Sequence, residues 1–305
     1  MTLEDTQPAA LDGFREDRVY LGADHARNER RTRIVAVICA VSLVLQVGGG
    51  LVFNSMALTA GGLHMAAHLA ALVTATLAYV FARRYAADAR FSFGTGKLGY
   101  LAGFANAVAL AFTAVLIAIE STQRLIHPEA VAYGAAVWVG VISLAVNLVS
   151  ALLLRPGRPG HAHDHDGDLN IGAAYLHLSA DVIVSTLAIG GLLAGRLLGW
   201  GWADPAAGLL GAALVARFAW SLTRRAGAVL LDMNPSPELT AEVRERLSAP
   251  GERLIDLHLW RLGPGHHAVL AVIAAADPQG PQVYRARLAG LPGISHVTVE
   301  VRREA

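Results

Sequence analysis

Six stretches of about 20 mostly apolar residues dominate this chain of 305 residues. A hydrocarbon layer of roughly 30 Å is crossed by about 20 residues of helix, so each stretch is long enough to be a membrane span. Only 16% of the residues are charged, against about 25% in an average soluble domain. The sequence therefore predicts an all-α membrane bundle of six transmembrane helices. The predicted spans are Ile34–Val52, Met56–Ala82, Leu98–Ser121, Val131–Leu154, Ile171–Ala194 and Pro205–Leu222.

Arginine and lysine collect on one side of the predicted bundle. They precede the first span, follow the sixth, and fill the connections between spans two and three and between spans four and five. Segments rich in Lys and Arg stay in the cytosol. We therefore expect both termini to be cytoplasmic and residues 1–33 to form a cytosolic arm. The membrane domain is expected at residues 34–225, with a cytosolic loop at 155–169.

The tail, residues 226–305, has the pattern of a small soluble α+β domain. Glu238–Leu247 and Val283–Leu291 have helical spacing, whereas Leu254–Arg261, His267–Ala275 and the region around Val299 alternate as strands do. In the first strand we expect Ile255, Leu257 and Leu259 to share one face. A core of about 70 residues is marginal, so dimerisation would help to stabilise this domain.

Four ionisable residues lie inside predicted spans, where such groups are costly and usually mark a functional site. His64 and His68 are four residues apart in span two, and His177 and Asp181 are four apart in span five. This spacing puts each pair on one helix face. Three imidazoles and one carboxylate match a tetrahedral site for Zn²⁺ or Co²⁺. A lone histidine could instead serve only as a hydrogen-bonding group, but two pairs at the same spacing favour a metal site.

A second group of potential ligands lies in the predicted loop between spans four and five. It contains His161, His163, Asp164 and His165. Such a tract can collect cytosolic metal, although it could also be a solvated linker. The single cysteine, Cys39, leaves no basis for a cysteine-based metal cluster.

Several motifs in different parts of the chain together resemble one known family. They are Ser55–Leu58 followed by Leu63–Met65, the Phe93–Lys97 loop, the His177-x-x-x-Asp181 pair, and Asp256–Trp260 followed by Gly263–His266. On these motifs the sequence is similar to the cation diffusion facilitators over nearly its whole length. The paired histidines of span two resemble the bacterial cobalt/nickel-efflux branch of that family, called DmeF-type.

The resemblance implies a homodimer of six-span protomers in the bacterial inner (plasma) membrane, with a metallochaperone-like, ferredoxin-like tail. It implies metal/proton antiport, with metal ions, protons and membrane lipid as partners and no nucleic acid. Position by position, the transport site of the family falls on His64, His68, His177 and Asp181. The metal, Co²⁺, Ni²⁺ or Zn²⁺, is then a transported substrate, and no catalytic cofactor is expected.

Three positions depart from the family pattern. Gly61 and Tyr100 stand where an acidic residue is common, and Ile255 replaces a histidine that often precedes Asp256. Candidate metal ligands in the tail are His258, His266, His267 and His296. The resemblance also implies a charge pair between Lys97 and Asp232.

Two other functions stay open at this point. A membrane metalloenzyme would need an open metal position and a general base, and neither is visible in the sequence. A membrane metal sensor would use the tail to report cytosolic metal to a partner.

Overall fold

The computed structural model describes residues 19–52, 56–128, 132–155 and 168–304, without the side chains of residues 56–61, 63 and 64. The chain divides into two compact units. The transmembrane unit comprises residues 23–81 and 98–231. The C-terminal unit comprises residues 232–305 together with 82–97 and the segment that ends at Gly22.

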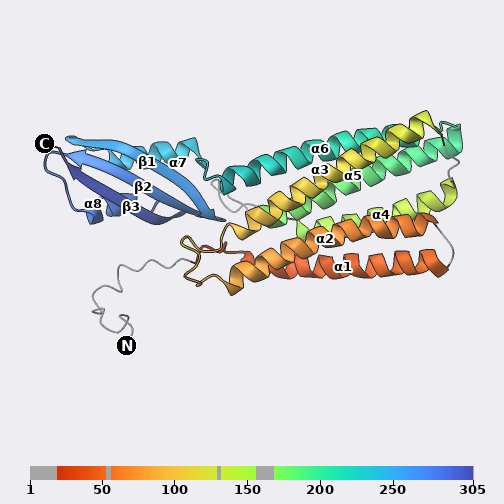
Figure 1. Cartoon of the computed structure of the whole chain (residues 1–305), viewed down its shortest axis with the longest axis horizontal. Coiled ribbons are helices and arrows are strands. Elements are labelled where there is room, and N and C mark those ends of the chain that lie inside the picture. The colour runs from red at the N-terminus through yellow and green to blue at the C-terminus, as the bar shows by residue number, and fades with distance from the viewer. Residues whose placement is uncertain (1–18, 53–55, 129–131, 156–167, 305) are drawn as a thin grey trace. The chain divides into compact units, whose positions relative to one another are not determined.

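The transmembrane unit consists of six helices, each long and apolar enough to cross a membrane, which confirms the predicted number of spans (Figure 1). Most of them extend beyond the predicted apolar stretch, because the helix continues through the polar residues that flank the lipid. The helices are α1 (His25–Val52), α2 (Met56–Arg84), α3 (Leu98–Ile126), α4 (Tyr133–Leu154), α5 (Leu169–Leu198) and α6 (Ala203–Leu230).

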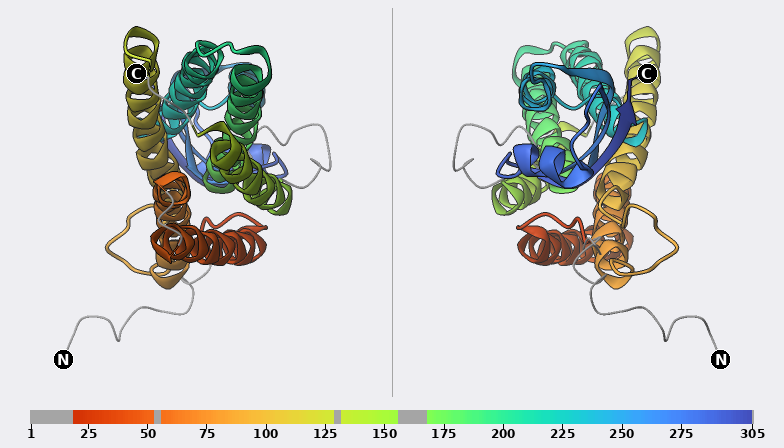
Figure 2. Two further views of the ribbon diagram at one scale, coloured as in Figure 1. Left: turned by 90° about the vertical axis from the view of Figure 1, so that its right-hand side faces the viewer. Right: turned by 90° about the vertical axis from the view of Figure 1, so that its left-hand side faces the viewer.

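Helix α5 occupies a central place in this unit, since it packs against α4 and α6 and also touches α3. Helix α3 packs along α6, and α1 packs on α4; Figure 2 views these helices nearly end-on. Small residues allow the close approach, as where Ala114, Ala180 and Ala219 meet between α3, α5 and α6.

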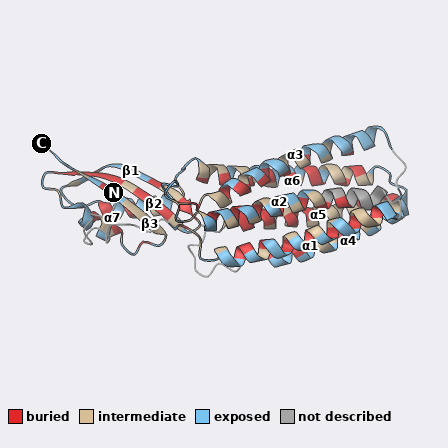
Figure 3. Cartoon of the chain, turned by 60° about the horizontal axis from the view of Figure 1, so that its bottom comes forward, coloured by how far each residue is buried: buried red, intermediate tan, exposed pale blue. Residues whose placement is uncertain are grey.

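Figure 3 shows exposed positions along the helices. Many of these positions carry large apolar side chains. Phe112, Trp138 and Trp220 are 66%, 70% and 71% exposed. Such a continuous apolar surface is not tolerated in water. Its natural surroundings are the acyl chains of a membrane, so the chain is a multi-pass membrane protein.

The C-terminal unit has the predicted order of helix, strand, strand, helix and strand. Its elements are α7 (Pro237–Leu247), β1 (Glu252–Gly263), β2 (His266–Ala275), α8 (Pro281–Leu288) and β3 (Ile294–Arg303). The strands form one sheet in the order β1-β2-β3; β1 and β2 are antiparallel, whereas β2 and β3 are parallel. The parallel pair requires a crossover connection, and α8 supplies it.

One face of this sheet is covered by α7 and α8. Leu247 of α7 and Tyr284 and Leu288 of α8 are buried against Val269 and Ile273 of β2. The fold class is therefore the predicted one, a six-helix membrane bundle followed by a small α+β domain.

The predicted alternation of β1 is wrong at Ile255. Leu254 pairs with Ile273 and Asp256 pairs with Val272, so Ile255 is an extra residue at a β-bulge. Its side chain is 50% exposed, and Leu254 takes its place beside the core. A bulge shifts the two-residue period by one, which the sequence alone did not indicate.

Candidate metal centre

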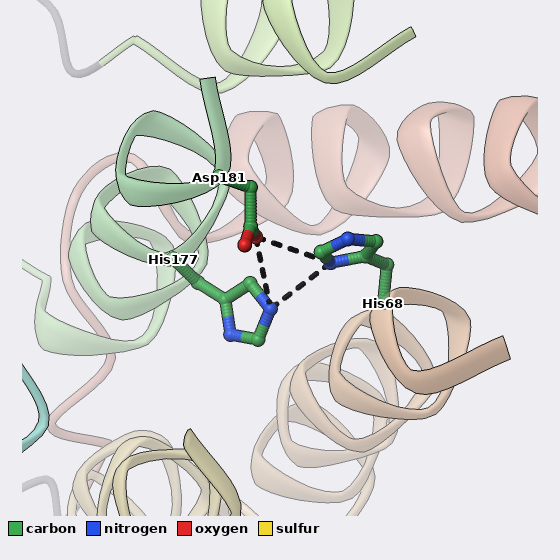
Figure 4. A group of neighbouring side chains, drawn as sticks. All are labelled: His68, His177 and Asp181. Atoms are coloured by element: carbon green, nitrogen blue, oxygen red, sulfur yellow. Dashed lines mark hydrogen bonds and ion pairs between the residues drawn. The ribbon is translucent and has the colours of Figure 1, made fainter. Parts of the chain in front are cut away.

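Three ionisable side chains of the transmembrane unit converge on one point (Figure 4). Nδ1 of His68 lies 3.0 Å from Nε2 of His177. Oδ2 of Asp181 lies 3.4 Å from the His68 nitrogen and 3.3 Å from the His177 nitrogen. The structure thus brings together three of the four residues that the sequence predicts for the transport site.

Two helices position this group. His68 comes from α2, and His177 and Asp181 come from successive turns of α5, as their four-residue spacing predicts. The two imidazole rings meet edge to face with their centroids 5.0 Å apart. His68 and Asp181 are buried, at 2% and 6% exposure, so the group lies inside the bundle and not on its lipid face.

The distances among the three ligand atoms suit a first-row divalent ion. Ligands at about 2.0–2.1 Å from Zn²⁺ stand about 3.3 Å apart at the corners of a tetrahedron. Three adjacent ligands of an octahedron at a similar radius would stand about 3.0 Å apart. The observed range of 3.0–3.4 Å covers both cases. The three atoms can therefore bind one ion with little movement of either helix.

The fourth predicted ligand, His64, belongs to α2, one turn before His68, but its side chain lies outside the described residues. The loop residues His161, His163, Asp164 and His165 also lie outside the described residues.

A small cavity adjoins the two histidine side chains. Its volume of about 10 Å³ is lined by His68, His177 and Asn106, with alanine and leucine side chains of α2 and α5. Asn106 of α3 donates a hydrogen bond to the carbonyl oxygen of Ala71 in α2, at 3.2 Å. Asn106 therefore links α3 to α2.

Asp168 falls within the predicted cytosolic loop 155–169, and its role at the start of α5 was not predicted. Its Oδ1 accepts a hydrogen bond from the backbone N–H of Asn170, at 3.0 Å. This contact caps α5. An Asp directly before an apolar helical run is a helix-start signal, and it could have been recognised as such.

Three of the four histidines of the C-terminal unit contact separate side chains. His258 contacts Asp256 at 2.8 Å, and His266 contacts Ser295 at 2.7 Å. His296 lies 3.2 Å from the hydroxyl of Thr298.

His267 is buried, and this burial, with a contribution from the charge of Arg261, lowers the pKa of its imidazole to about 4. Among the described residues of the C-terminal unit, no three potential ligands converge on one point. Metal binding by His258, His266, His267 and His296 stays a prediction.

The predicted charge pair between Lys97 and Asp232 is present. Asp232 adopts a positive φ of 56° directly after α6, in the left-handed region that ends many helices and that Asp tolerates better than most residues. The pair therefore fixes the chain at the point where it leaves the last membrane helix.

Comparison with known proteins decides the family. The sequence pattern of the cation efflux transmembrane domain matches residues 32–231, which is more than half of the chain. The chain belongs to the cation efflux family. This confirms the resemblance to the cation diffusion facilitators, and it means that the protein is a transporter and not an enzyme.

Similar proteins support the same assignment over nearly the whole length. The chain is 30% identical to the cadmium, cobalt and zinc/H(+)-K(+) antiporter of Bacillus subtilis, over 92% of each chain. It is also 30% identical to the metal cation efflux system protein CzcD of Cupriavidus metallidurans, over 92% of this chain and 90% of that protein. The zinc transporter ZitB of Escherichia coli is 34% identical over 77% of this chain and 74% of its own.

Proposed function

We propose that this protein exports Co²⁺, Ni²⁺ or Zn²⁺ from the cytosol in exchange for protons, with His64, His68, His177 and Asp181 as the transport site. The convergence of three ligand atoms within 3.4 Å of one another, inside a membrane bundle, carries this proposal. The names of the relatives agree with it, since they include a cadmium, cobalt and zinc antiporter and a zinc transporter.

The same geometry explains why metal and protons exchange. Two imidazole nitrogens 3.0 Å apart would oppose their lone pairs unless a proton lies between them. A metal ion needs both lone pairs. Where one ring is an imidazolium, its extra proton must leave the site before the metal binds, whereas an N–H between two neutral rings can move to the other nitrogen of its own ring. Protons and metal therefore compete for the same atoms, and one site that opens alternately to each side of the membrane couples their opposite movements.

The ligand types set the class of metal. Imidazole suits Zn²⁺, Co²⁺ and Ni²⁺, whereas Mg²⁺ and Ca²⁺ prefer oxygen ligands. Cu(I) prefers sulfur ligands. Between His64 and His68 only Met65 carries sulfur, and one thioether is not enough for a Cu(I) site. A site of imidazoles with one carboxylate thus favours divalent transition metals.

We further propose the bacterial inner membrane as the location, with both termini in the cytosol. The cytosolic parts are then the arm 1–33, the loop 155–169 and the C-terminal domain 226–305, and residues 34–225 span the membrane. The arginine and lysine distribution supports this orientation. A homodimer surrounded by lipid is the proposed assembly, and the assignment to the DmeF-type branch stays a prediction.

Metal flux in proteoliposomes with an imposed pH gradient tests the function. We expect flux of at least one of Co²⁺, Ni²⁺ and Zn²⁺ in the wild type. This flux should be lost in Asp181→Asn and kept in Asp88→Asn, since Asp88 pairs with Arg90 outside the bundle. Absence of flux for all three metals in folded wild-type protein would contradict transport and leave the sensor function as the better explanation.

A further inference from the structure

The carboxylate of Asp168 joins three helices at one end of the transmembrane unit. Its Oδ1 caps α5 through the N–H of Asn170. Its Oδ2 accepts a hydrogen bond from the side-chain amide of Asn28 in α1, at 3.0 Å, and another from the hydroxyl of Tyr79 in α2. Asn28 and Tyr79 are buried, at 5% and 3% exposure.

The contacts of Asp168 form one layer of polar contacts, and a second layer lies next to it. The side-chain amide of Asn170 in α5 donates a hydrogen bond to the carbonyl oxygen of Ala75 in α2, at 2.9 Å. Nε2 of His25 in α1 lies 3.0 Å from the carbonyl oxygen of Tyr79. Polar contacts thus connect α2 with α5 at two successive turns and connect α1 with both.

These layers lie on one side of the candidate metal centre. On α2, Ala75 and Tyr79 follow His68 by 7 and 11 residues, or about 10 and 16 Å along the helix. On α5, Asn170 and Asp168 precede His177 by a similar distance. The small cavity beside the ligands lies between them and these layers, since it is lined by Leu72 and Ala174, among others.

This side is the one that the proposed orientation places in the cytosol, because α2 ends at Arg83 and Arg84 just beyond Tyr79. A metal ion that travels between α2 and α5 from the cytosol must pass both layers before it reaches His68. Helix α5 packs only sparsely on α1 in comparison with α4 and α6. The contacts of Asp168 are therefore a principal connection between α5 and α1 at this end.

We propose that Asp168, Tyr79 and Asn28 form a latch that closes the cytosolic end of the metal path, and that it must open before metal reaches the transport site. The proposal rests on the proposed function. The three residues act on transport through the position of α5, and they are positioning residues and not metal ligands. The described structure has the latch closed.

A thiol-accessibility experiment tests the latch directly. A reporter, Ala174→Cys, is placed in the cavity lining of a Cys39→Ser chain, and a membrane-impermeant thiol reagent is added from the cytosolic side. Tyr79→Phe removes one hydroxyl and keeps the ring. Loss of one hydrogen bond to a carboxylate shifts a two-state equilibrium by about tenfold, so we expect about tenfold faster labelling.

The matched control is Tyr175→Phe on α5. The hydroxyl of Tyr175 has no hydrogen bond to any residue that the structure describes, so its removal should leave labelling unchanged. Equal labelling rates in the two variants would overturn the proposal. If Tyr79→Phe does not elute as folded protein, Asn28→Ala is compared with Tyr175→Phe instead. Asn28→Ala removes the other side-chain donor to Oδ2 of Asp168.

Transport kinetics separate a latch from a merely structural contact. A looser latch raises the population open to the cytosol, so KM for cytosolic metal should fall in Tyr79→Phe, while kcat should fall because closure becomes slower. A variant that only destabilises the fold would lower kcat without lowering KM, and that result would contradict the latch. The labelling measurement needs no flux, so failure of the latch and failure of the transport function are distinguishable.

Discussion

Metal binding to the proposed transport site should weaken as the pH falls. A metal ion needs the lone pairs of Nδ1 of His68 and Nε2 of His177, which lie 3.0 Å apart. When both rings are neutral, the N–H between these atoms can move to the other nitrogen of its own ring, so metal binding releases no proton. When one ring is an imidazolium, one proton must leave the site before the metal binds. In that pH range the dissociation constant of the metal should rise about tenfold for each unit by which the pH falls, which corresponds to about 1.4 kcal/mol.

Isothermal titration calorimetry in buffers of different ionisation enthalpy measures this release. Titrations with Zn²⁺ and Co²⁺ at several pH values give the slope of affinity against pH. His127→Gln is the control, because His127 is an exposed histidine directly after α3 that is not a candidate ligand, and the proton release should persist in this variant. Zero release together with a flat affinity from about pH 5.5 to 7.5, a range that brackets the ordinary titration of histidine, would refute competition between protons and metal, and with it the proposed basis of exchange.

Further predictions concern single positions. Asp181→Asn should weaken metal binding by about a hundredfold to a few thousandfold in a direct binding titration, since removing one partner of a buried charged group costs about 3–5 kcal/mol; a change below threefold would exclude Asp181 as a ligand. A Lys97→Ala, Asp232→Ala double-mutant cycle should give a coupling of about 0.2–1 kcal/mol in chemical unfolding, because the pair is partly exposed; no coupling would contradict a stabilising pair. The burial that lowers the pKa of His267 to about 4 keeps it neutral in the fold, whereas the unfolded chain takes up a proton below about 6.5. Stability should therefore decline as the pH falls from about 6.5 to 4, and His267→Phe should lessen this decline in thermal unfolding; an unchanged decline would show another group to be its cause.

Much of the fold and part of the site could be predicted because lipid imposes a strict length and composition on helices. The four-residue spacing of His177 and Asp181 predicted one helix face, and in the structure a nitrogen of His68 from another helix lies beside both. The separation of the ligand atoms could not be predicted. It depends on how α2 and α5 pack, and the sequence does not contain that distance.

Two features escaped prediction for different physical reasons. The bulge at Ile255 arises from the pairing of β1 with β2, so the period of β1 alone could not reveal it. The contacts of Asp168 with Asn28 and Tyr79 join residues 140 and 89 positions away. Only the role of Asp168 as the N-cap of α5 could have been predicted locally, because an Asp directly before an apolar helical run indicates the start of a helix.

The cavity beside the ligands also affects the speed of selection. With about 10 Å³, it holds about one water, so a hydrated ion cannot fit into it with its first shell intact. At the proposed transport site, an ion would therefore have to exchange most of its waters before His68 and His177 could bind it. Mg²⁺ gives up water reluctantly, so slow dehydration would disfavour it in addition to its weaker affinity for nitrogen. Discrimination at the proposed site would then begin as a difference in rates.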